Sequence, residues 1–350
     1  MGALSAQDVA SALRDAPAVR IVGGGTKLAW GRPMEAPELS LAELDAVVEH
    51  NEGDFTAILQ AGVPLGAAQR LFADAGQMLA LDPPDDGATV GGVVATADSG
   101  PLRHRYGGPR DVILGVQVAM ADGTLARAGS KVIKNVAGYD LAKLMTGAYG
   151  TLGVVTEVSV RLHPRPREAL TVVVRSDDPR ALAATASELA HRPLEAERLD
   201  VRWQDGSGAV LVQLCGPSAV DRAASLDGEV VEDDDALWSA QRAAQRGPVV
   251  LRVSSTQQGL ADVLDAAREH GATCVARAAH GLAWLRFDRA DAELVGRLRA
   301  RLGRCTLLDA PAELRREVDP WGTLAAEPLM RRVKARFDPF DTCNPGLLLT

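Results

Sequence analysis

The sequence predicts an α+β protein, for three reasons. Short strands and helices alternate in the first part of the chain, the segment His163-Pro164-Arg165-Pro166 then interrupts this pattern, and beyond it one order of elements occurs twice. A chain of 350 residues also exceeds one typical hydrophobic core, so two domains are expected. The predicted units are a first domain over 1–164, a second over 165–325, and a tail over 326–350 that returns to the first.

Composition and charge exclude several classes of protein. Only 4% of the residues are aromatic, which leaves few stacking surfaces for single-stranded nucleic acid, and the net charge of −8 disfavours a polyanionic partner. No apolar run reaches the roughly 18 residues of a membrane span, and the N-terminus lacks the basic and apolar regions of a signal peptide. We expect a cytoplasmic protein, and attachment to a membrane through partners stays open.

The cysteines and histidines show no pattern typical of a metal site. The four cysteines are far apart and form no CxxC pair, so we expect reduced thiols and no iron–sulfur ligands: Cys215, Cys274, Cys305 and Cys343. None of the six histidines lies at metal-ligand spacing from another. The sequence therefore predicts no metal.

The first domain begins with a capped helix over 5–16, in which Ser5 and Asp8 form a capping box. A similar pair, Ser40 with Glu43, predicts a second helix that carries Leu44, Val47 and Val48. The other elements are strands over 19–22, 55–60, 112–120, 124–128 and 154–160, a helix over 64–75, and a short helix that ends at Gly147. Residues 82–112 show no sustained period and predict a functional loop.

The second domain repeats the order strand-helix-strand-strand-helix-strand. The first copy covers 169–175, 179–191, 197–203, 210–214, 218–226 and 229–232, and the second covers 249–254, 260–270, 273–278, 282–287, 291–302 and 305–308. A linking helix over 236–245 joins the copies. Two such βαββαβ-like halves predict one antiparallel sheet with helices on one face. The tail, a helix over 327–336 followed by Asp-Pro and Pro-Gly turns, is expected to be pinned to the fold.

Three glycine-rich turns are candidates for a ligand site. After the strand 19–22, Gly23-Gly24-Gly25-Thr26-Lys27 offers backbone N–H groups that could cradle a diphosphate. Leu28 occupies the third glycine position of a dinucleotide fingerprint, and no Gly-Lys-Ser/Thr is present, so neither a Rossmann nor a Walker motif fits. An ordinary strand-to-helix turn is the alternative.

The second turn, from Thr89 to Gly100, consists almost entirely of small residues, which let a flat ring lie against the backbone. The basic cluster 103–106 follows, and a solvated loop is the alternative. The third turn places Gly147, Gly150 and Gly153 between a helix and a strand, where a helix C-cap and a plain turn would also explain them.

Four motifs in chain order resemble the FAD-binding fold of the vanillyl-alcohol oxidase type, or PCMH type, and within it the E subunits of glycolate oxidases. The motifs are GGGTK, then DPPDDGATVGGVVA with SGPLRHRYGGPRDVILGV, then KNVAGYDLAKLMTGAYGTLGVVTEVSVRLHP, and FDP with NPG in the tail. They cover about half of the chain. The resemblance implies a PCMH-type FAD-binding domain of two α+β subdomains and an antiparallel-sheet cap domain.

The resemblance also implies a cofactor and its contacts. FAD would be bound without a covalent link, because the glycine turn carries no histidine or cysteine. The implied contacts are Gly23, Gly24, Gly25, Thr26, Lys27, Pro83, Thr89, Gly91, Gly92, Ser99, Gly100, Tyr106, Gly150, Thr151, Gly153 and Val155. Arg103, Arg105 and Lys134 are candidates for a cation that favours the reduced flavin.

Two motifs that the catalytic members of the family carry are altered in this sequence, and both changes weaken the expectation of independent catalytic activity. Their His-Ala-Gly-Asp-Gly-Asn-like motif is here Ala279-His280-Gly281-Leu282-Ala283-Trp284, and their Asn-Ala-Gly-Gly is Ala97-Asp98-Ser99-Gly100. His280 and Arg105 remain weak catalytic candidates, and a surface histidine without a catalytic role is the alternative for His280.

The resemblance implies the FAD-binding subunit of a glycolate oxidase-like complex. Such a subunit would act in electron transfer or assembly beside a catalytic flavoprotein and an iron–sulfur subunit, with a small 2-hydroxy acid such as glycolate as substrate. The alternatives are a self-sufficient 2-hydroxy-acid dehydrogenase, which needs a general base and a carboxylate-binding arginine, and a scaffold subunit that only retains the fold.

Overall fold

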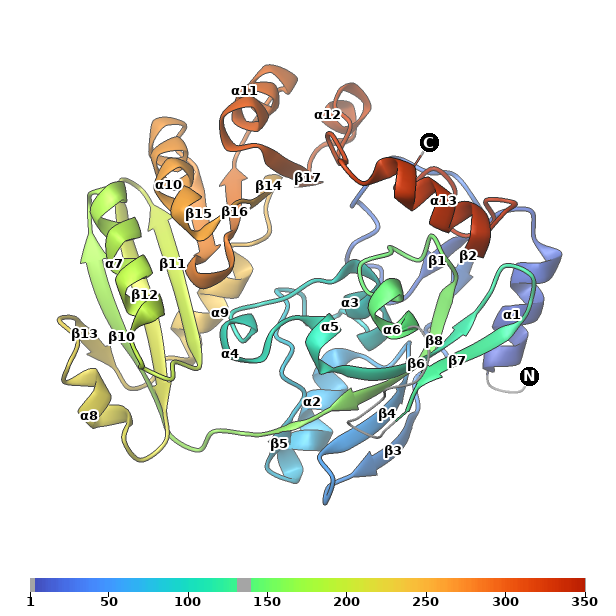
Figure 1. Ribbon diagram of the computed structural model, residues 1–350, viewed down its shortest axis with the longest axis horizontal. Coiled ribbons are helices and arrows are strands. Elements are labelled where there is room, and N and C mark those ends of the chain that lie inside the picture. Colours follow the sequence, from blue (N-terminus) through green and yellow to red (C-terminus); the bar gives the residue numbers. More distant parts are fainter. Residues whose placement is uncertain (1–3, 131–139, 350) are drawn as a thin grey trace.

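The computed structural model describes residues 4–130 and 140–349, in which two sheets dominate the architecture (Figure 1). One sheet has five strands and is formed by the first part of the chain, and the other has eight strands and is formed by the second part. The predicted α+β class is confirmed. Lys134 lies outside the described residues.

The five-stranded sheet is antiparallel and has the order β3-β4-β8-β6-β7. These strands are β3 (Val47–Asn51), β4 (Thr56–Gln60), β8 (Val154–Arg161), β6 (Ile113–Ala119) and β7 (Leu125–Gly129). Helices α1 (Ala6–Asp15) and α2 (Leu65–Asp74) share its apolar core, and α1 has the predicted Ser5–Asp8 capping box. A separate parallel pair, β1 (Arg20–Val22) with β2 (Glu38–Ser40), precedes this sheet.

The predicted helix after Ser40 is wrong. Ser40 ends β2, and Val47 begins β3, which pairs with β4 as a hairpin. The β-branched residues Val47 and Val48 favour a strand, where one side chain faces the core and the next faces solvent. Val48 is indeed exposed. The Ser40–Glu43 spacing matched a capping box by coincidence.

Residues 82–112 hold three short helices instead of a continuous loop: α3 (Val90–Thr96), α4 (Arg103–Tyr106) and α5 (Pro109–Val112). The Thr89 side chain caps α3 by accepting a hydrogen bond from the Gly92 N–H at 3.3 Å. Helices of four to seven residues are too short to show a period in the sequence, and glycine and valine in α3 hide its helical propensity.

Helix α6 (Leu141–Met145) and then β8 follow in the chain. Part of the predicted linker 163–166 forms a strand. Its first half is β9 (His163–Pro164), which pairs with β5 (Gln77–Met78). The chain then enters the eight-stranded sheet.

The eight-stranded sheet consists of two halves with the same topology. Its order is β13-β10-β12-β11-β15-β16-β14-β17, so each half places its fourth strand beside its first and its third beside its second. The predicted repeat is thus present, and β11 pairs with β15 at the centre. The first half contains β10 (Ala169–Ser176), α7 (Pro179–His191), β11 (Arg198–Gln204), β12 (Ser207–Cys215), α8 (Ala219–Ala223) and β13 (Glu229–Val231), and the second β14 (Val249–Ser254), α10 (Leu260–Glu269), β15 (Thr273–Arg277), β16 (Leu282–Phe287), α11 (Ala292–Leu302) and β17 (Arg304–Asp309).

The two faces of this sheet differ. Helices α7, α10 and α11 cover one face and form a large apolar core with it (Figure 1). The linking helix α9 (Asp235–Ala243) lies on the other face, where Trp238 packs against Val173 and Leu211. Beside α9, an apolar cluster that includes Trp30, Tyr149 and Trp284 joins this face to the first domain.

The C-terminal segment contains α12 (Ala312–Glu317), which the sequence did not predict, and α13 (Glu327–Phe337). Beyond α13 the tail bonds to β1: Val19 N–H donates to the Thr342 carbonyl at 2.8 Å, and Asn344 N–H donates to the Val19 carbonyl at 3.0 Å. Lys334 holds this tail by donating to the carbonyls of Thr151 and Cys343. Over the described residues, no helix is long and apolar enough to cross a membrane.

Candidate functional site

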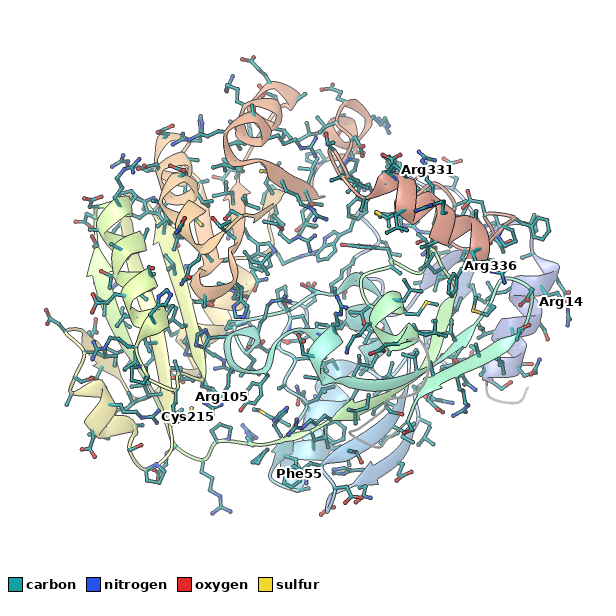
Figure 2. The ribbon with its side chains drawn as sticks, viewed as in Figure 1. Arg14, Phe55, Arg105, Cys215, Arg331 and Arg336 are labelled. Atoms are coloured by element: carbon teal, nitrogen blue, oxygen red, sulfur yellow. The ribbon has the colours of Figure 1, made fainter. Side chains whose placement is uncertain are left out.

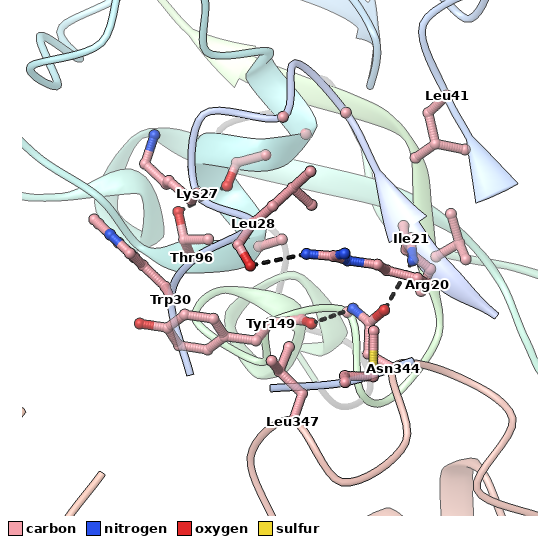
Figure 3. A pocket seen from close by; sticks show the side chains of 18 of the residues that line it. Arg20, Ile21, Lys27, Leu28, Trp30, Leu41, Thr96, Tyr149, Asn344 and Leu347 are labelled. Carbon is pink, nitrogen blue, oxygen red and sulfur yellow. Dashed lines mark hydrogen bonds between the residues drawn. The ribbon is translucent and has the colours of Figure 1, made fainter. Parts of the chain in front are cut away.

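A cavity of about 700 Å³ opens where β1, α3, the turn before β8 and the C-terminal tail meet (Figure 3). Its size falls within the usual range of small-molecule sites. Most of the residues that line it come from four segments: 20–35, 89–96, 145–155 and 344–347. Leu41, Ala61 and Arg315 of α12 also contribute. The three glycine-rich turns of the sequence therefore lie around one cavity.

The first turn needs glycine because its backbone lies against another segment. A Cβ at Gly24 would overlap the Gly87 carbonyl oxygen, and a Cβ at Gly23 would overlap the Thr89 hydroxyl. Among the described residues, the N–H groups of Gly24, Gly25, Thr26 and Lys27 have no hydrogen-bond partner. Successive unpaired N–H groups at a cavity wall form an anion-binding concavity, which suits a diphosphate.

The third turn is held by the C-terminal tail. The Asn344 side chain donates to the Tyr149 carbonyl at 2.7 Å and accepts from the Ile21 N–H at 2.8 Å, so it connects this turn to β1 (Figure 3). Gly150 has a φ of +69°, and a Cβ there would come within 2.8 Å of the Asn344 amide. The sequence indicated a pinned tail but did not identify Asn344 as part of the cavity wall.

In the second turn, glycines serve packing as well as the cavity. A Cβ at Gly91 would lie 2.5 Å from the Ala61 Cβ, so glycine lets α3 approach the end of β4. A Cβ at Gly100 would overlap the Asp82 carbonyl, although Gly100 does not line the cavity.

The cavity brings together most of the predicted contacts. The ones that line it are Gly23, Gly24, Gly25, Thr26, Lys27, Thr89, Gly91, Gly92, Gly150, Gly153 and Val155. Five do not: Pro83, Ser99, Gly100, Tyr106 and Thr151.

Those five have other surroundings. Pro83 is buried, and the Ser99 carbonyl accepts a hydrogen bond from Gln245 of the second domain at 3.2 Å. The Tyr106 hydroxyl donates to Glu197 of β11 at 2.7 Å, and Thr151 faces a smaller cavity beside α13.

The two weak catalytic candidates lie outside the cavity wall. Arg105 projects from α4 toward the second domain (Figure 2), where it donates to the Glu195 carbonyl at 3.1 Å and lies 3.5 Å from Glu197. The His280 ring lies 6.2 Å from the His104 ring. Burial and the nearby Arg103 and Arg277 lower the pKa of His280.

Lys27 does not offer a free charge to the cavity. Its Nζ lies 3.1 Å from Asp98 and 3.5 Å from Asp85, and the Lys27 side chain is only 6% exposed. Burial raises the pKa of Asp98, and Lys27 offsets part of that rise. The diphosphate cradle therefore depends on backbone N–H groups more than on the Lys27 ammonium.

Several arginine and histidine side chains lie close together where the first domain packs against the face of the eight-stranded sheet that carries α9. Arg277 is fully buried, donates to Asp200 at 2.7 Å and to Gln245, and stacks over Trp284. Arg103 and Arg252 each have a buried Nε without a hydrogen-bond partner among the described residues.

Nearby, the Tyr149 hydroxyl is also buried without a described partner, and burial raises its pKa although Arg252 opposes the rise. Burial, with His280 and Arg105, lowers the pKa of His104 to about 4, so His104 is neutral at pH 7. The sequence singled out the basic cluster 103–106 and His280, but it gave no signal that joins them to Tyr149, Arg252 and Arg277, because these lie far apart in the chain.

Two comparisons identify the class of the first domain. Residues 3–129 match the family model of the FAD binding domain. The solved structure of an alkyldihydroxyacetonephosphate synthase is similar to 97% of this chain and 74% of its own, with a TM-score of 0.67 and 16% identity, which shows the fold. Residues 3–129 are therefore similar to FAD binding domains, which supports FAD as the cofactor, and the chain has the fold of that synthase. The glycine cradle and its unpaired N–H groups fit that cofactor.

Particular relatives confirm the resemblance to glycolate oxidase E subunits. Glycolate oxidase subunit GlcE of Escherichia coli is 38% identical over 168 residues, which are 47% of this chain and 48% of GlcE. GlcD of Bacillus subtilis is 36% identical over 48% of this chain and 36% of its own length. A mitochondrial D-lactate dehydrogenase [cytochrome] of Saccharomyces cerevisiae is 32% identical over 45% and 27%. The matched part thus spans about half or less of each relative.

Proposed function

We propose that this chain is the FAD-binding subunit of a complex that oxidises a small 2-hydroxy acid such as glycolate. It would relay electrons or support assembly beside a catalytic flavoprotein and an iron–sulfur subunit, in the cytoplasm or at a membrane through those partners. The observation that carries the proposal is the 38% identity to GlcE over 168 residues of this chain. The cavity lined by the three glycine-rich turns supports it as the place where FAD would bind.

In this proposal the cofactor's diphosphate occupies the cradle at residues 24–27, and its flexible part and ring run along 89–96. The link is non-covalent, which the described cavity wall supports because it contains no histidine or cysteine. FAD supplies the redox chemistry when bound. The chain's own residues bind the diphosphate, orient the cofactor and exclude water from it.

A self-sufficient dehydrogenase is the second candidate, and one observation favours it. Arg103 and Arg252 could bind a carboxylate, since guanidinium groups match its geometry. His104 and His280 have rings 6.2 Å apart and could act as general bases in their neutral forms, although burial lowers the pKa of both and makes them weaker bases. The scaffold role, with FAD lost, is the third candidate.

An anaerobic titration separates these roles. The purified, FAD-loaded chain is mixed with glycolate or D-lactate, and the flavin absorbance is followed, with dithionite as the final reductant. The proposal predicts flavin that stays oxidised with either acid and bleaches only with dithionite. Bleaching by an acid alone would contradict it and support a self-sufficient dehydrogenase, and a chain that never takes up FAD would support the scaffold role.

A further inference from the structure

Three arginines bind carbonyl groups in and directly after the glycine turn 23–27, which we call the diphosphate-binding loop. Arg246 donates to the Thr26 carbonyl at 3.1 Å, Arg20 to the Leu28 carbonyl at 2.9 Å, and Arg315 to the Ala29 carbonyl at 2.8 Å. Arg20 belongs to β1 beside the loop (Figure 3). Arg246 and Arg315 belong to the segments around the eight-stranded sheet, more than 200 residues away in sequence.

Arg246 is fixed in place by its surroundings. Its Nε lies 3.3 Å from Asp309, at the end of β17, and 3.8 Å from Asp85. Its guanidinium lies 5.2 Å from the centre of the Trp30 ring, and the Trp30 indole N–H donates to the same Asp309 at 2.9 Å. Asp85 also neighbours Lys27 at 3.5 Å, so Arg246 and the loop share one partly buried group of charges.

Arg315 approaches from the other side. It lies on α12, at the C-terminal side of the eight-stranded sheet, and lines the cavity itself. Its Nε is buried without a hydrogen-bond partner among the described residues. Arg315 therefore has one donor on the Ala29 carbonyl and one buried donor without a described partner.

This arrangement determines which way the loop's peptide groups point. Each peptide has its N–H and C=O on opposite sides, so holding a carbonyl against an arginine turns the following N–H away from it. The peptide held by Arg246 carries the Lys27 N–H, which is one of the unpaired N–H groups of residues 24–27. The peptide held by Arg315 carries the Trp30 N–H, which donates to the Lys27 carbonyl at 3.0 Å, so Arg315 fixes the end of the loop. Hydrogen bonds from a guanidinium are charge-assisted and strong, and they also compensate the carbonyl dipoles that would repel an anion.

We propose that Arg246 and Arg315 are positioning residues for FAD, through which the second domain sets the orientation of the diphosphate-binding loop. FAD binding would then depend on the docking of the eight-stranded sheet, and not on the first domain alone. The inference rests on FAD binding to this cavity.

The test measures FAD affinity by titration calorimetry on the full chain, for wild type and for Arg246→Met and Arg315→Met separately. Each variant loses the donor to one carbonyl, and we expect FAD to bind roughly 10- to 100-fold more weakly. Arg297→Met is the matched control, since Arg297 is an exposed arginine of α11 that pairs with Glu293 in the same helix. Its FAD affinity should equal that of wild type.

Two further readouts distinguish positioning from a general loss of stability. ADP shares the diphosphate of FAD and should lose affinity by a similar factor. Arg246→Lys retains a donor and should recover part of the affinity. If Arg246→Met does not fold, Arg315→Met carries the test alone.

The outcomes separate this inference from FAD binding itself. A wild-type chain that binds no FAD would overturn the cofactor assignment and the inference together. A wild-type chain that binds FAD, with both methionine variants binding it equally well, would overturn the inference alone. A loss of thermal stability without a change in FAD or ADP affinity would also overturn it.

Discussion

The glycine turn 23–27 and the face of the eight-stranded sheet that carries α9 present polar groups by different means. In the loop, glycines let the main chain itself provide the donors, and any side chain would overlap Gly87 or Thr89. On the sheet face, long side chains provide the polar groups, as in the buried pair of Arg277 with Asp200. The first region is made of neighbours in sequence, and the second of residues that only the fold brings together.

The two regions therefore tolerate different substitutions. A backbone site depends on the absence of atoms, so adding a single side chain should remove binding while leaving the rest of the fold intact. A buried network of side chains depends on the presence of every partner, so removing one should destabilise the protein. Three substitutions test this contrast, and their expected effects on FAD affinity or on the free energy of unfolding decrease in the order Gly24→Val, Arg277→Met and His104→Gln.

The largest effect is expected for Gly24→Val. The new side chain would overlap the Gly87 carbonyl and displace the loop, so FAD affinity should fall by at least about 1000-fold, or about 4 kcal/mol. The measurement is the flavin-to-protein ratio after purification, together with calorimetry.

The control for this variant is Gly296→Ala in α11, where an added Cβ meets nothing within 4 Å. It should keep the wild-type FAD content. Full FAD binding by Gly24→Val would show that the diphosphate does not lie on this loop.

Next in size is Arg277→Met on the sheet face. It removes one partner of a buried pair and leaves the Asp200 carboxylate without its cation, which typically costs about 3–5 kcal/mol of unfolding free energy. Urea denaturation of the FAD-free chain measures this loss. The exposed pair of Arg297 with Glu293 gives the comparison, and Arg297→Met should cost less than about 1 kcal/mol. Equal losses in the two variants would refute the contrast.

The smallest effect concerns pH and His104. Burial lowers its folded pKa to about 4 from an ordinary value near 6.5, so the unfolded chain takes up a proton first as the pH falls. The free energy of unfolding therefore includes no loss from His104 above pH 6.5. It falls progressively as the pH drops from 6.5 to about 4, because the unfolded chain binds the proton more tightly. Between pH 7 and pH 5, wild type should lose roughly 1–2 kcal/mol more than His104→Gln. Parallel losses in both proteins would contradict the assignment.

The sequence predicted the eight-stranded sheet well, because its elements are long, periodic and separated by clear turns. Strand β14 and helix α7 begin and end where the pattern placed them. Two regions of the first domain were missed for physical reasons. Val47 and Val48 follow a false capping box, and α3 to α5 are shorter than any detectable period.

At the candidate site, the sequence identified the glycine turn with its backbone N–H donors. It did not identify the side chains from distant segments that hold this turn and the cavity wall. Glycine clusters are visible in a sequence because few residue types can replace them. Arg246, Arg315 and Asn344 carry no such signal, since an isolated arginine or asparagine is most often a surface residue. Only the packing of the tail and the second domain against the first domain places Arg315 and Asn344 at the cavity and Arg246 against the Thr26 carbonyl.

The central claim is that the glycine loop binds FAD without a covalent bond, and titrating the purified full chain with FAD tests it most directly. Quenching of flavin fluorescence gives the stoichiometry, and denaturation followed by filtration shows whether the flavin is released. We predict one FAD per chain, all of it released on unfolding. A chain that binds no FAD, or that retains flavin after denaturation, would contradict the account.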